Sequence, residues 1–468
     1  MSARVAVIGG GLAGITAALD CAAAGARVTL LEVRPRLGGA AYSFEREGLR
    51  MDNGQHVFLR CCTAYRSLLA RIGGEHGVHV QPRLEIPVLS PGEPAVTLRR
   101  SGLPAPLHLA GALARYRHLR LSQRLGAARA ALALGRLDPD APELDERNLG
   151  EWLAARGQDA QAVAALWDLI ALPTLNLPAA QASLALGAFV LREGLLRRAD
   201  AGDIGFHRRP LSEIIGDPAE RALHAAGVQV RLSCRAGALR RTGNGFEVLC
   251  GNAQRSAEEQ EEDEGEGGAR QRTAAPASGE EDPVSADAVV IALPHARAAR
   301  LIEPLDAGAA ARAGALRAEP IVNLHVVYDR VVCEQPFAAG VRTPVQYVFD
   351  RSVAGGVGAG RQYLAVSLSG AEREMGMSVN ELREHYLPAL DELFPRVRAA
   401  RVEQFLVTRE HAATFRAQPG VAALRCGPRT TTVGLTLAGA WTATGWPATL
   451  EGAVLSGHAA ARCALEAL

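Results

Sequence analysis

The sequence contains no lysine, so all 51 of its Lys and Arg residues are arginine. Mechanisms that depend on a lysine amine, such as Schiff-base catalysis, are therefore excluded. The 51 basic residues are balanced by 50 acidic residues, so the composition gives no reason to expect a nucleic-acid partner. The eight cysteines include no C-x-x-C pair in a chain of 468 residues. We therefore expect reduced thiols, with neither a disulfide framework nor a metal site.

We also expect no cleavable leader, because no basic region and apolar stretch precede the strand predicted to begin at Arg4. The sequence therefore predicts a cytoplasmic protein. The run Leu169–Leu191 carries no charge and is long enough to cross a bilayer. It also contains Pro173, Pro178 and several polar residues. This composition favours two short buried helices over a membrane span.

A β-α-β pattern opens the chain. Val5–Ile8 predicts a buried strand, Leu12–Ala24 an Ala- and Leu-rich helix, and Arg27–Glu32 a second strand. The turn after the first strand has the spacing G-x-G-x-x-G, which lets a backbone approach a pyrophosphate at a helix N-terminus. Glu32 ends the second strand, where an acid accepts hydrogen bonds from a ribose hydroxyl. The candidate residues of the phosphate-binding turn are Gly9, Gly11, Leu12, Ala13 and Gly14.

The residues after Glu32 form an arginine-bearing turn and a glycine pair, Gly38-Gly39. They resemble the second dinucleotide signature of the flavin amine oxidase and phytoene desaturase superfamily. In this superfamily the glycines pass under the pyrophosphate, and an arginine usually follows the pair. This chain has Ala40 at that position, so we expect Arg36 to supply the phosphate contact.

The C-terminal segments Leu437–Trp441, Thr444–Pro447 and Leu450–Ala453 resemble the closing segment of the same superfamily. In that family a helix points its N-terminus at the pyrimidine edge of the flavin, where it stabilises the negative charge of the reduced ring. The resemblance implies FAD as the cofactor. It also implies further contacts, which are Gly54, Gln55, Ala236, Gly439, Trp446, Pro447, Glu451 and Gly452.

These patterns together predict an α/β protein, with a Rossmann-like FAD-binding domain of the amine oxidase type and a mixed α+β substrate domain. We assign residues 1–80, 205–300 and 416–468 to the FAD-binding domain. Residues 81–204 form a mainly helical segment that faces substrate or membrane, and residues 301–415 form the sheet and helices of the substrate domain. Within a predicted hairpin, residues 257–282 are acidic and lack large apolar side chains, so we expect a disordered insertion there.

Asp52-Asn53-Gly54-Gln55-His56 and the run Thr444–Thr449 resemble one branch of the superfamily, the hydroxysqualene dehydroxylases, also called squalene-associated FAD-dependent desaturases. The resemblance implies that an allylic hydroxyl of a lipophilic C30 isoprenoid is replaced by hydrogen in hopanoid biosynthesis. It leaves the electron donor open. Two alternatives use the same fold: desaturation of a carotenoid precursor such as phytoene, and oxidation of a polar amine. Trp441 and Trp446 could mimic the aromatic pair of an amine site, but no anionic subsite is evident.

Hydroxide is a poor leaving group, so a general acid must protonate it as the C–O bond weakens. The candidate acids near the flavin are His56, Asp52 and Glu451. His56 equally fits a structural hydrogen bonder. Glu451 equally fits a structural carboxylate at the start of a helix.

Residues 107–137 interleave leucine and alanine with five arginines, which are Arg115, Arg117, Arg120, Arg124 and Arg129. Such a basic amphipathic stretch is typical of peripheral contact with an anionic membrane, here the inner face of the cell membrane. The alternative is a solvated arginine face on a core helix.

Overall fold

The computed structural model describes residues 2–252 and 283–468, so the predicted insertion 257–282 lies outside the described residues. Five parallel strands form the central sheet of the first domain, in the order β10-β2-β1-β14-β20. Three parts of the chain supply these strands, and all three FAD-binding segments predicted from the sequence contribute. The strands are β1 (Arg4–Ile8), β2 (Arg27–Leu31), β10 (Gln229–Arg231), β14 (Ala288–Ile291) and β20 (Leu435–Leu437).

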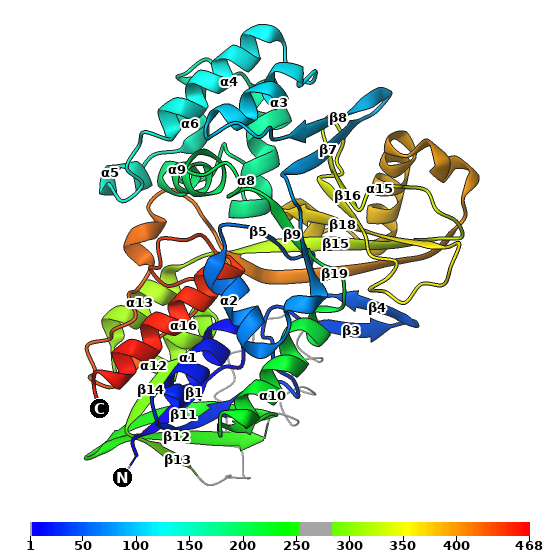
Figure 1. Ribbon diagram of the computed structural model, residues 1–468. Helices are drawn as coiled ribbons and strands as arrows, with labels where there is room; N and C mark the ends of the chain where they lie inside the picture. The colour runs from blue at the N-terminus through cyan, green and yellow to red at the C-terminus, as the bar shows by residue number, and fades with distance from the viewer. Residues whose placement is uncertain (1, 253–282) are drawn as a thin grey trace.

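The central sheet is the middle of three layers, because the two faces of each strand are buried against different elements. Val5 and Val7 of β1 belong to one apolar cluster with helix side chains, whereas Ala6 and Ile8 belong to another. The first face packs against α1 (Leu12–Ala23), α10 (Asp217–Ala225) and α16 (Leu450–Leu465), and α1 and α16 lie side by side (Figure 1). Near-continuous apolar strands are what two covered faces require.

The second face is covered by an antiparallel sheet and two helices. These elements are β11 (Cys234–Thr242), β12 (Gly245–Asn252), β13 (Val284–Ala286), α12 (His295–Ile302) and α13 (Ala307–Ala315). Gly243 and Asn244 form the turn between β11 and β12, and Gly245, the first residue of β12, has a φ of +146°. A side chain is strained in that conformation, so the glycine fits this hairpin.

The second domain is built on a seven-stranded sheet in the order β19-β15-β18-β17-β16-β7-β8. Helix α15 packs on one face of this sheet through buried Leu382 and Leu390. The elements are β7 (Glu85–Ser90), β8 (Glu93–Arg99), β15 (Ala318–Tyr328), β16 (Phe337–Gly340), β17 (Tyr347–Asp350), β18 (Gln362–Ser369), β19 (Val402–Phe415), α14 (Glu372–Met375) and α15 (Val379–Leu393).

Strands β7 and β8 differ from the expectation that residues 81–204 are mainly helical. β8 alternates exposed and more buried residues from Ala95 to Arg99, whereas β7 ends in three consecutive buried residues, and the turn Pro91-Gly92 joins them, where Gly92 has a φ of +69°. Val88 and Val96 pair across the hairpin and are buried. The alternation and the Pro-Gly turn are strand signals, and they extend the sheet of the second domain back to residue 85.

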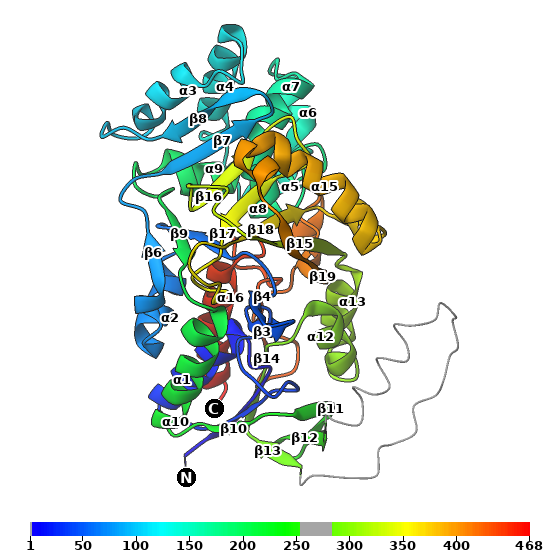
Figure 2. The same cartoon turned by 90° about the vertical axis from the view of Figure 1, so that its right-hand side faces the viewer.

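The remainder of this segment is helical, as predicted, and forms a cap at one end of the molecule in both views (Figures 1 and 2). Its helices are α3 (Ala110–Arg115), α4 (Leu121–Leu134), α5 (Pro142–Asp145), α6 (Leu149–Ala154), α7 (Ala160–Ala162), α8 (Asp168–Leu175) and α9 (Leu184–Leu191). The uncharged run Leu169–Leu191 is thus divided between two buried helices of eight residues, which confirms the prediction. Among the described residues, no helix combines the length and the apolarity that crossing a bilayer requires.

Smaller elements join the two domains. They are β3 (Ser43–Arg46), β4 (Leu49–Asp52), β5 (Val57–Leu59), β6 (Val78–Val80), β9 (Ile204–His207) and α2 (Thr63–Ile72). Short helices of other types occur throughout the described chain: the 3-10 helices are η1 (Glu75–Gly77), η2 (Leu107–Leu109), η6 (Pro395–Ala399) and η7 (Val421–Leu424), and the π-helices are η3 (Val163–Trp167), η4 (Arg192–Leu196) and η5 (Ser212–Gly216). Strands β5 and β6 both pair with β9, so the first segment is tied to the end of the helical cap.

Candidate functional site

The turn between β1 and α1 has glycines for two different reasons. Gly9 has a φ of +111°, and a Cβ on Gly14 would lie 1.8 Å from the Gly9 carbonyl oxygen. The fold itself therefore requires both residues. At Gly11, in contrast, an added Cβ would meet only the Gly39 Cα, at 3.7 Å, which is an ordinary contact. The chain does not need a glycine at position 11, whereas a ligand approaching the backbone would.

The side chain of Glu32 is hydrogen-bonded to the backbone of this turn. Its carboxylate accepts hydrogen bonds from the Gly10 N–H at 2.6 Å and from the Arg34 N–H at 2.8 Å. Each oxygen keeps one lone pair, so the carboxylate can still accept from a ribose hydroxyl. The glycine pair abuts the same turn, because the Gly38 N–H donates to the Gly10 carbonyl at 2.9 Å.

Arg36 lies beside the glycine pair with its guanidinium 3.5 Å from the centre of the Tyr42 ring. Burial lowers the pKa of Arg36, and the nearby charge of Arg34 lowers it further, while Tyr42 raises it. A partly desolvated arginine next to a second cation is stabilised by an anion. The structure thus places a cation near the position where Ala40 cannot provide one.

Three polar side-chain atoms around the Asn53–Gly54 segment are buried without hydrogen-bond partners. Asn323 of β15 donates to the Asn53 carbonyl at 3.1 Å, but its own Oδ1 has no hydrogen-bond partner and is buried. Gln55 Nε2 and His56 Nε2 are likewise buried without partners. An unsatisfied buried polar atom costs about 1–3 kcal/mol. A ligand that bonds to these atoms would offset that cost, so the arrangement fits a bound cofactor or substrate.

Asp52 and Arg351 form a buried ion pair next to these atoms, between β4 and the residue that follows β17. The Asp52 carboxylate also accepts from Ser43 Oγ at 2.6 Å and from the Leu211 N–H at 3.0 Å. These contacts engage both oxygens of the Asp52 carboxylate, so it holds Arg351 and the neighbouring segments in place. The second guanidinium nitrogen of Arg351 donates to the His207 carbonyl.

His207 holds the backbone of His56. Its Nδ1 donates to the His56 carbonyl at 2.8 Å, and its Nε2 accepts from the Tyr65 hydroxyl at 2.7 Å. Burial, together with the nearby His56 and Arg351, lowers the pKa of His207 to about 3, so its ring is neutral. Burial also lowers the pKa of His56, where Asp52 opposes the shift and Arg351 adds to it.

A cavity of about 490 Å³ opens beside this cluster. Asp52, Gln55 and His56 lie on its polar side, and Phe206 and Phe349 contribute apolar wall. This volume falls in the range of about 300–1,000 Å³ that is usual for small-molecule sites.

The carboxylates around the cavity already have partners. Asp350 accepts from Ser352 Oγ at 2.6 Å and from Gln362 Nε2 at 2.8 Å. Glu334 lies 2.7 Å from Arg396. Together with the Asp52–Arg351 pair, these contacts leave no uncompensated carboxylate among the residues that line the cavity.

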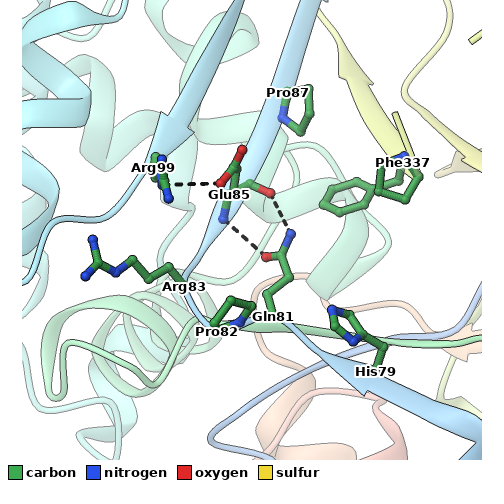
Figure 3. A pocket seen from close by; sticks show the side chains of 9 residues that line it. His79, Gln81, Pro82, Arg83, Glu85, Pro87, Arg99 and Phe337 are labelled. Atoms are coloured by element: carbon green, nitrogen blue, oxygen red, sulfur yellow. Dashed lines mark hydrogen bonds and ion pairs between the residues drawn. The ribbon is translucent and has the colours of Figure 1, made fainter. Parts of the chain in front are cut away.

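A second cavity, of about 330 Å³, adjoins the first, and Pro336 lines both (Figure 3). Two pairs of its polar groups bond to each other. Glu85 pairs with Arg99 at 3.2 Å, and Gln81 Nε2 donates to the Glu85 carbonyl at 2.9 Å. The Phe337 ring at its edge lies 6.2 Å from the Phe206 ring of the first cavity.

The C-terminal segment returns to the same end of the central sheet through β20. Gly439 has a φ of +137°, and its N–H donates to Ser456 Oγ at 2.7 Å. Arg425 fixes the loop that follows, donating to the Trp441 carbonyl at 3.2 Å and to the Trp446 carbonyl at 2.6 Å. Pro447 and Gly452 come together where α16 begins, since a Cβ on Gly452 would lie 3.0 Å from the Pro447 carbonyl oxygen.

Glu451 caps a different helix from its own. Its carboxylate accepts from the Ala64 N–H at 3.0 Å and from the Tyr65 N–H at 2.7 Å, at the start of α2. Burial raises the pKa of Glu451, and these backbone N–H groups oppose the shift. The geometry supports the structural alternative for this residue, in which a carboxylate satisfies free N–H groups at a helix start.

Ala236 lies in β11, whose first residue is bonded to Glu32: the Cys234 N–H donates to the Glu32 carbonyl at 2.9 Å. The neighbouring Arg235 has a buried Nε without a partner. The strand that carries the predicted FAD contact Ala236 thus begins next to the predicted ribose-binding acid Glu32.

Sequence reasoning missed three residues of the site, Arg351, Asn323 and Arg425. Arg351 and Asn323 contact segments far away in the chain, whereas Arg425 contacts backbone carbonyls 16 to 21 residues further on. No local motif surrounds any of the three. Arg34 lies within the recognised turn and was not assigned a role.

Comparison with known proteins agrees with this geometry. The family model of flavin containing amine oxidoreductases matches residues 12–465. A hydroxysqualene dehydroxylase of Rhodopseudomonas palustris is 28% identical over 477 residues, covering 100% of this chain and 99% of that protein. A zeta-carotene desaturase of Zea mays is 30% identical over 176 residues, covering 35% of this chain and 31% of that protein. The structure of a triple mutant of putrescine oxidase superimposes with a TM-score of 0.72 at 18% identity, with 99% of both chains covered.

The three-layer dinucleotide-binding domain and the site beside it define an FAD-dependent oxidoreductase. The chain belongs to the family of flavin containing amine oxidoreductases.

Alanine substitutions at Gly11 and Gly14 can distinguish a glycine that cofactor binding requires from one that the fold requires. Gly11→Ala should fold normally, because its Cβ meets nothing closer than 3.7 Å, yet bind FAD at least about tenfold more weakly. Gly14→Ala should fold poorly, because its Cβ would overlap the Gly9 carbonyl. Circular dichroism, apoprotein melting and flavin titration distinguish the outcomes. A Gly11→Ala protein with unchanged FAD affinity would contradict the assignment.

The neutral His207 predicts a pH dependence of stability. Its pKa is about 3 in the folded state, against about 6.5 for an unfolded histidine. The unfolded chain therefore binds the additional proton, and the free energy of unfolding should fall by about 1.4 kcal/mol per pH unit as the pH drops from about 6 towards 3. His207→Gln should remove this contribution in urea titrations. His76→Gln is the control, since the His76 side chain is 90% exposed, and equal slopes in all three proteins would refute the prediction.

Proposed function

We propose that the protein replaces the allylic hydroxyl group of hydroxysqualene by hydrogen and releases squalene, in hopanoid biosynthesis. The C–O bond breaks, the hydroxyl takes up a proton and leaves as water, and a hydride equivalent takes its place. Reduced FAD, when bound, supplies that hydride and its two electrons. A lipophilic substrate of this kind resides in bilayers, so the proposal includes a peripheral location of the enzyme at the inner face of the membrane.

The observation that carries the proposal is the cavity with two unpartnered nitrogens and no free carboxylate. Gln55 Nε2 and His56 Nε2 are buried without partners, and either can hydrogen-bond a neutral hydroxyl. The carboxylates Asp52 and Asp350 are engaged by other residues. A neutral, mostly apolar alcohol fits this environment better than a positively charged amine, which would need an unpaired anion.

The comparisons favour the reductive reaction over desaturation. The hydroxysqualene dehydroxylase of R. palustris is matched over the whole chain, whereas the zeta-carotene desaturase of Z. mays is matched over 35% of it. The likeness to putrescine oxidase, at 18% identity, concerns the fold alone.

We assign the cofactor contacts from the predicted residues and their geometry. The β1–α1 turn binds the pyrophosphate at the N-terminus of α1, and Arg36 and Arg34 add positive charge there. Glu32 accepts from the ribose with its free lone pairs, and Ala236 lies on the adenine side. The loop before α16 and the N-terminus of that helix face the pyrimidine edge, with Arg425 holding the loop in place.

We assign the proton donor to His56, with Gln55 orienting the leaving hydroxyl. Asp52 holds Arg351, and Glu451 holds α2, so neither is required as the acid. A lowered pKa makes the protonated His56 a stronger acid and also a rarer species at neutral pH.

Anaerobic incubation of the photoreduced holoprotein with hydroxysqualene should give squalene, identified by product mass, with loss of one oxygen and gain of no isotope from labelled water oxygen. Oxidised holoprotein should leave the substrate unchanged. Flavin reduction by phytoene or by putrescine, with no reaction of hydroxysqualene, would favour one of the alternatives and overturn the proposal.

The role of His56 predicts the direction of the pH profile. Because only the protonated ring donates, single-turnover rates should rise as the pH falls towards its lowered pKa, by at most about tenfold per pH unit. His56→Asn should lower the rate about 100-fold or more and flatten the profile, with FAD content unchanged. Rates that fall with decreasing pH in the wild type would exclude His56 as the acid.

A further inference from the structure

The helical cap exposes an unusual share of large apolar side chains. Ten such side chains are exposed in the described part of the chain, and five of them lie between residues 103 and 132. Their exposed fractions range from 45% to 69%, and they are Leu103, Leu107, Leu121, Leu125 and Leu132. Single exposed leucines are common on proteins, but such a concentration within one part of the chain indicates an interaction site.

Helix α4 has one face towards the protein and one without a partner. Ala127, Ala130 and Leu134 are buried against the cap, whereas Leu121, Leu125 and Leu132 are exposed. The spacing of the three leucines, by four and seven residues, places them on one side of an α-helix. Leu103 and Leu107 lie in the segment that leads from β8 to α3.

Positive charge surrounds these leucines. Residues 101–137 contain six arginines and no aspartate or glutamate. Arg129 and Arg136 continue the spacing of the exposed face, and both are exposed. Arg120 is paired with Asp159 at 3.0 Å, and Arg124 donates to backbone carbonyls, so these two contribute less to a free surface. The net charge of +1 for the whole chain therefore conceals a local positive surface.

We propose that this face, made of α4 and the 103–107 loop and here called the leucine–arginine face, docks on an anionic lipid bilayer. The leucines enter the apolar boundary of the lipid, and the arginines bind phosphate groups at the surface. The face lies at the end of the molecule opposite β11–β13, with the seven-stranded sheet between them (Figures 1 and 2). Docking there leaves the dinucleotide-binding sheet away from the membrane.

Two other occupants fit less well. A second copy that docked through the same face would bring the exposed Arg129 and Arg136 against the same two arginines of its partner, which is repulsive. Nucleic acid would match the charge but offers no apolar partner for five leucines. This inference extends the proposed function, because it gives a lipid-soluble substrate a route to the enzyme, but binding can be measured without any turnover.

The test is co-sedimentation of the FAD-loaded protein with phosphatidylcholine vesicles, with and without phosphatidylglycerol. We expect binding only when phosphatidylglycerol is present, with weakening by salt as charges are screened. Leu121→Gln with Leu125→Gln and Leu132→Gln should lower binding by about tenfold or more, since glutamine keeps helix propensity but removes apolar area. Arg129→Gln with Arg136→Gln should lower it by about 25-fold, at about fivefold for each arginine.

Matched controls lie elsewhere on the surface. Val353→Gln with Val433→Gln removes exposed apolar side chains that are 89% and 68% exposed, and Arg240→Gln with Arg241→Gln removes an exposed arginine pair at the opposite end of the molecule. Neither control should change vesicle binding.

The proposal fails if the controls weaken binding as much as the leucine variant. It also fails if the leucine variant converts a dimer to a monomer in size exclusion, or if duplex DNA binds more tightly than vesicles. Loss of vesicle binding with normal conversion of detergent-dispersed hydroxysqualene supports the inference, and docking without conversion would fault only the proposed reaction.

Discussion

The buried ion pair between Asp52 and Arg351 is the contact on which the arrangement of the site depends. It joins the end of β4 to the residue after β17, and the same guanidinium donates to the His207 carbonyl. Two domains and the strand β9 therefore meet at one side chain. Removing one partner of a buried pair leaves an uncompensated charge and typically costs about 3–5 kcal/mol. The pair also neutralises the carboxylate nearest to the cavity, so the same contact that holds the domains together sets the chemistry of the pocket.

A second line of contacts reaches the same place from the C-terminus. Glu451 of α16 caps α2, the Tyr65 hydroxyl of α2 donates to His207, and His207 donates to the His56 carbonyl. The helix that closes the central sheet and the loop that lines the cavity are thereby coupled through three hydrogen-bonded groups. Because His207 and Tyr65 are fully enclosed, each bond in this line lies in a low-dielectric setting where losing a partner is expensive.

Whether a part of the fold or of the site could be predicted from the sequence depends mainly on how far apart the contacting residues are along the chain. The β1–α1 turn, Glu32 and the helix α16 follow from patterns within about thirty residues, because β-α-β units impose glycine spacing and apolar periodicity locally. Arg351 and Arg425 could not be found in this way. The carboxylate partner of Arg351 is distant in the chain and is brought close only by the fold, and the partners of Arg425 are backbone carbonyls, which leave no pattern in the sequence. An isolated arginine carries no pattern that distinguishes a buried contact from a surface charge. Glu451 is the opposite case. The sequence identified it as a candidate residue of the site, but the hydrogen bonds by which it caps α2 could not be predicted.

The overall composition of the chain also gives a wrong impression of the charge of a local surface. A net charge of +1 argues correctly against a protein that is basic overall, but it averages residues 101–137, which hold six arginines and no acid, with acidic stretches elsewhere. Electrostatic attraction is screened over about 8 Å at physiological ionic strength, so a docking surface responds to the charges within that range and not to the total. The helical cap and the dinucleotide-binding sheet lie towards opposite ends of the molecule in both views (Figures 1 and 2). One chain can therefore combine a locally cationic, leucine-bearing end with a neutral interior in which every carboxylate around the cavity is compensated.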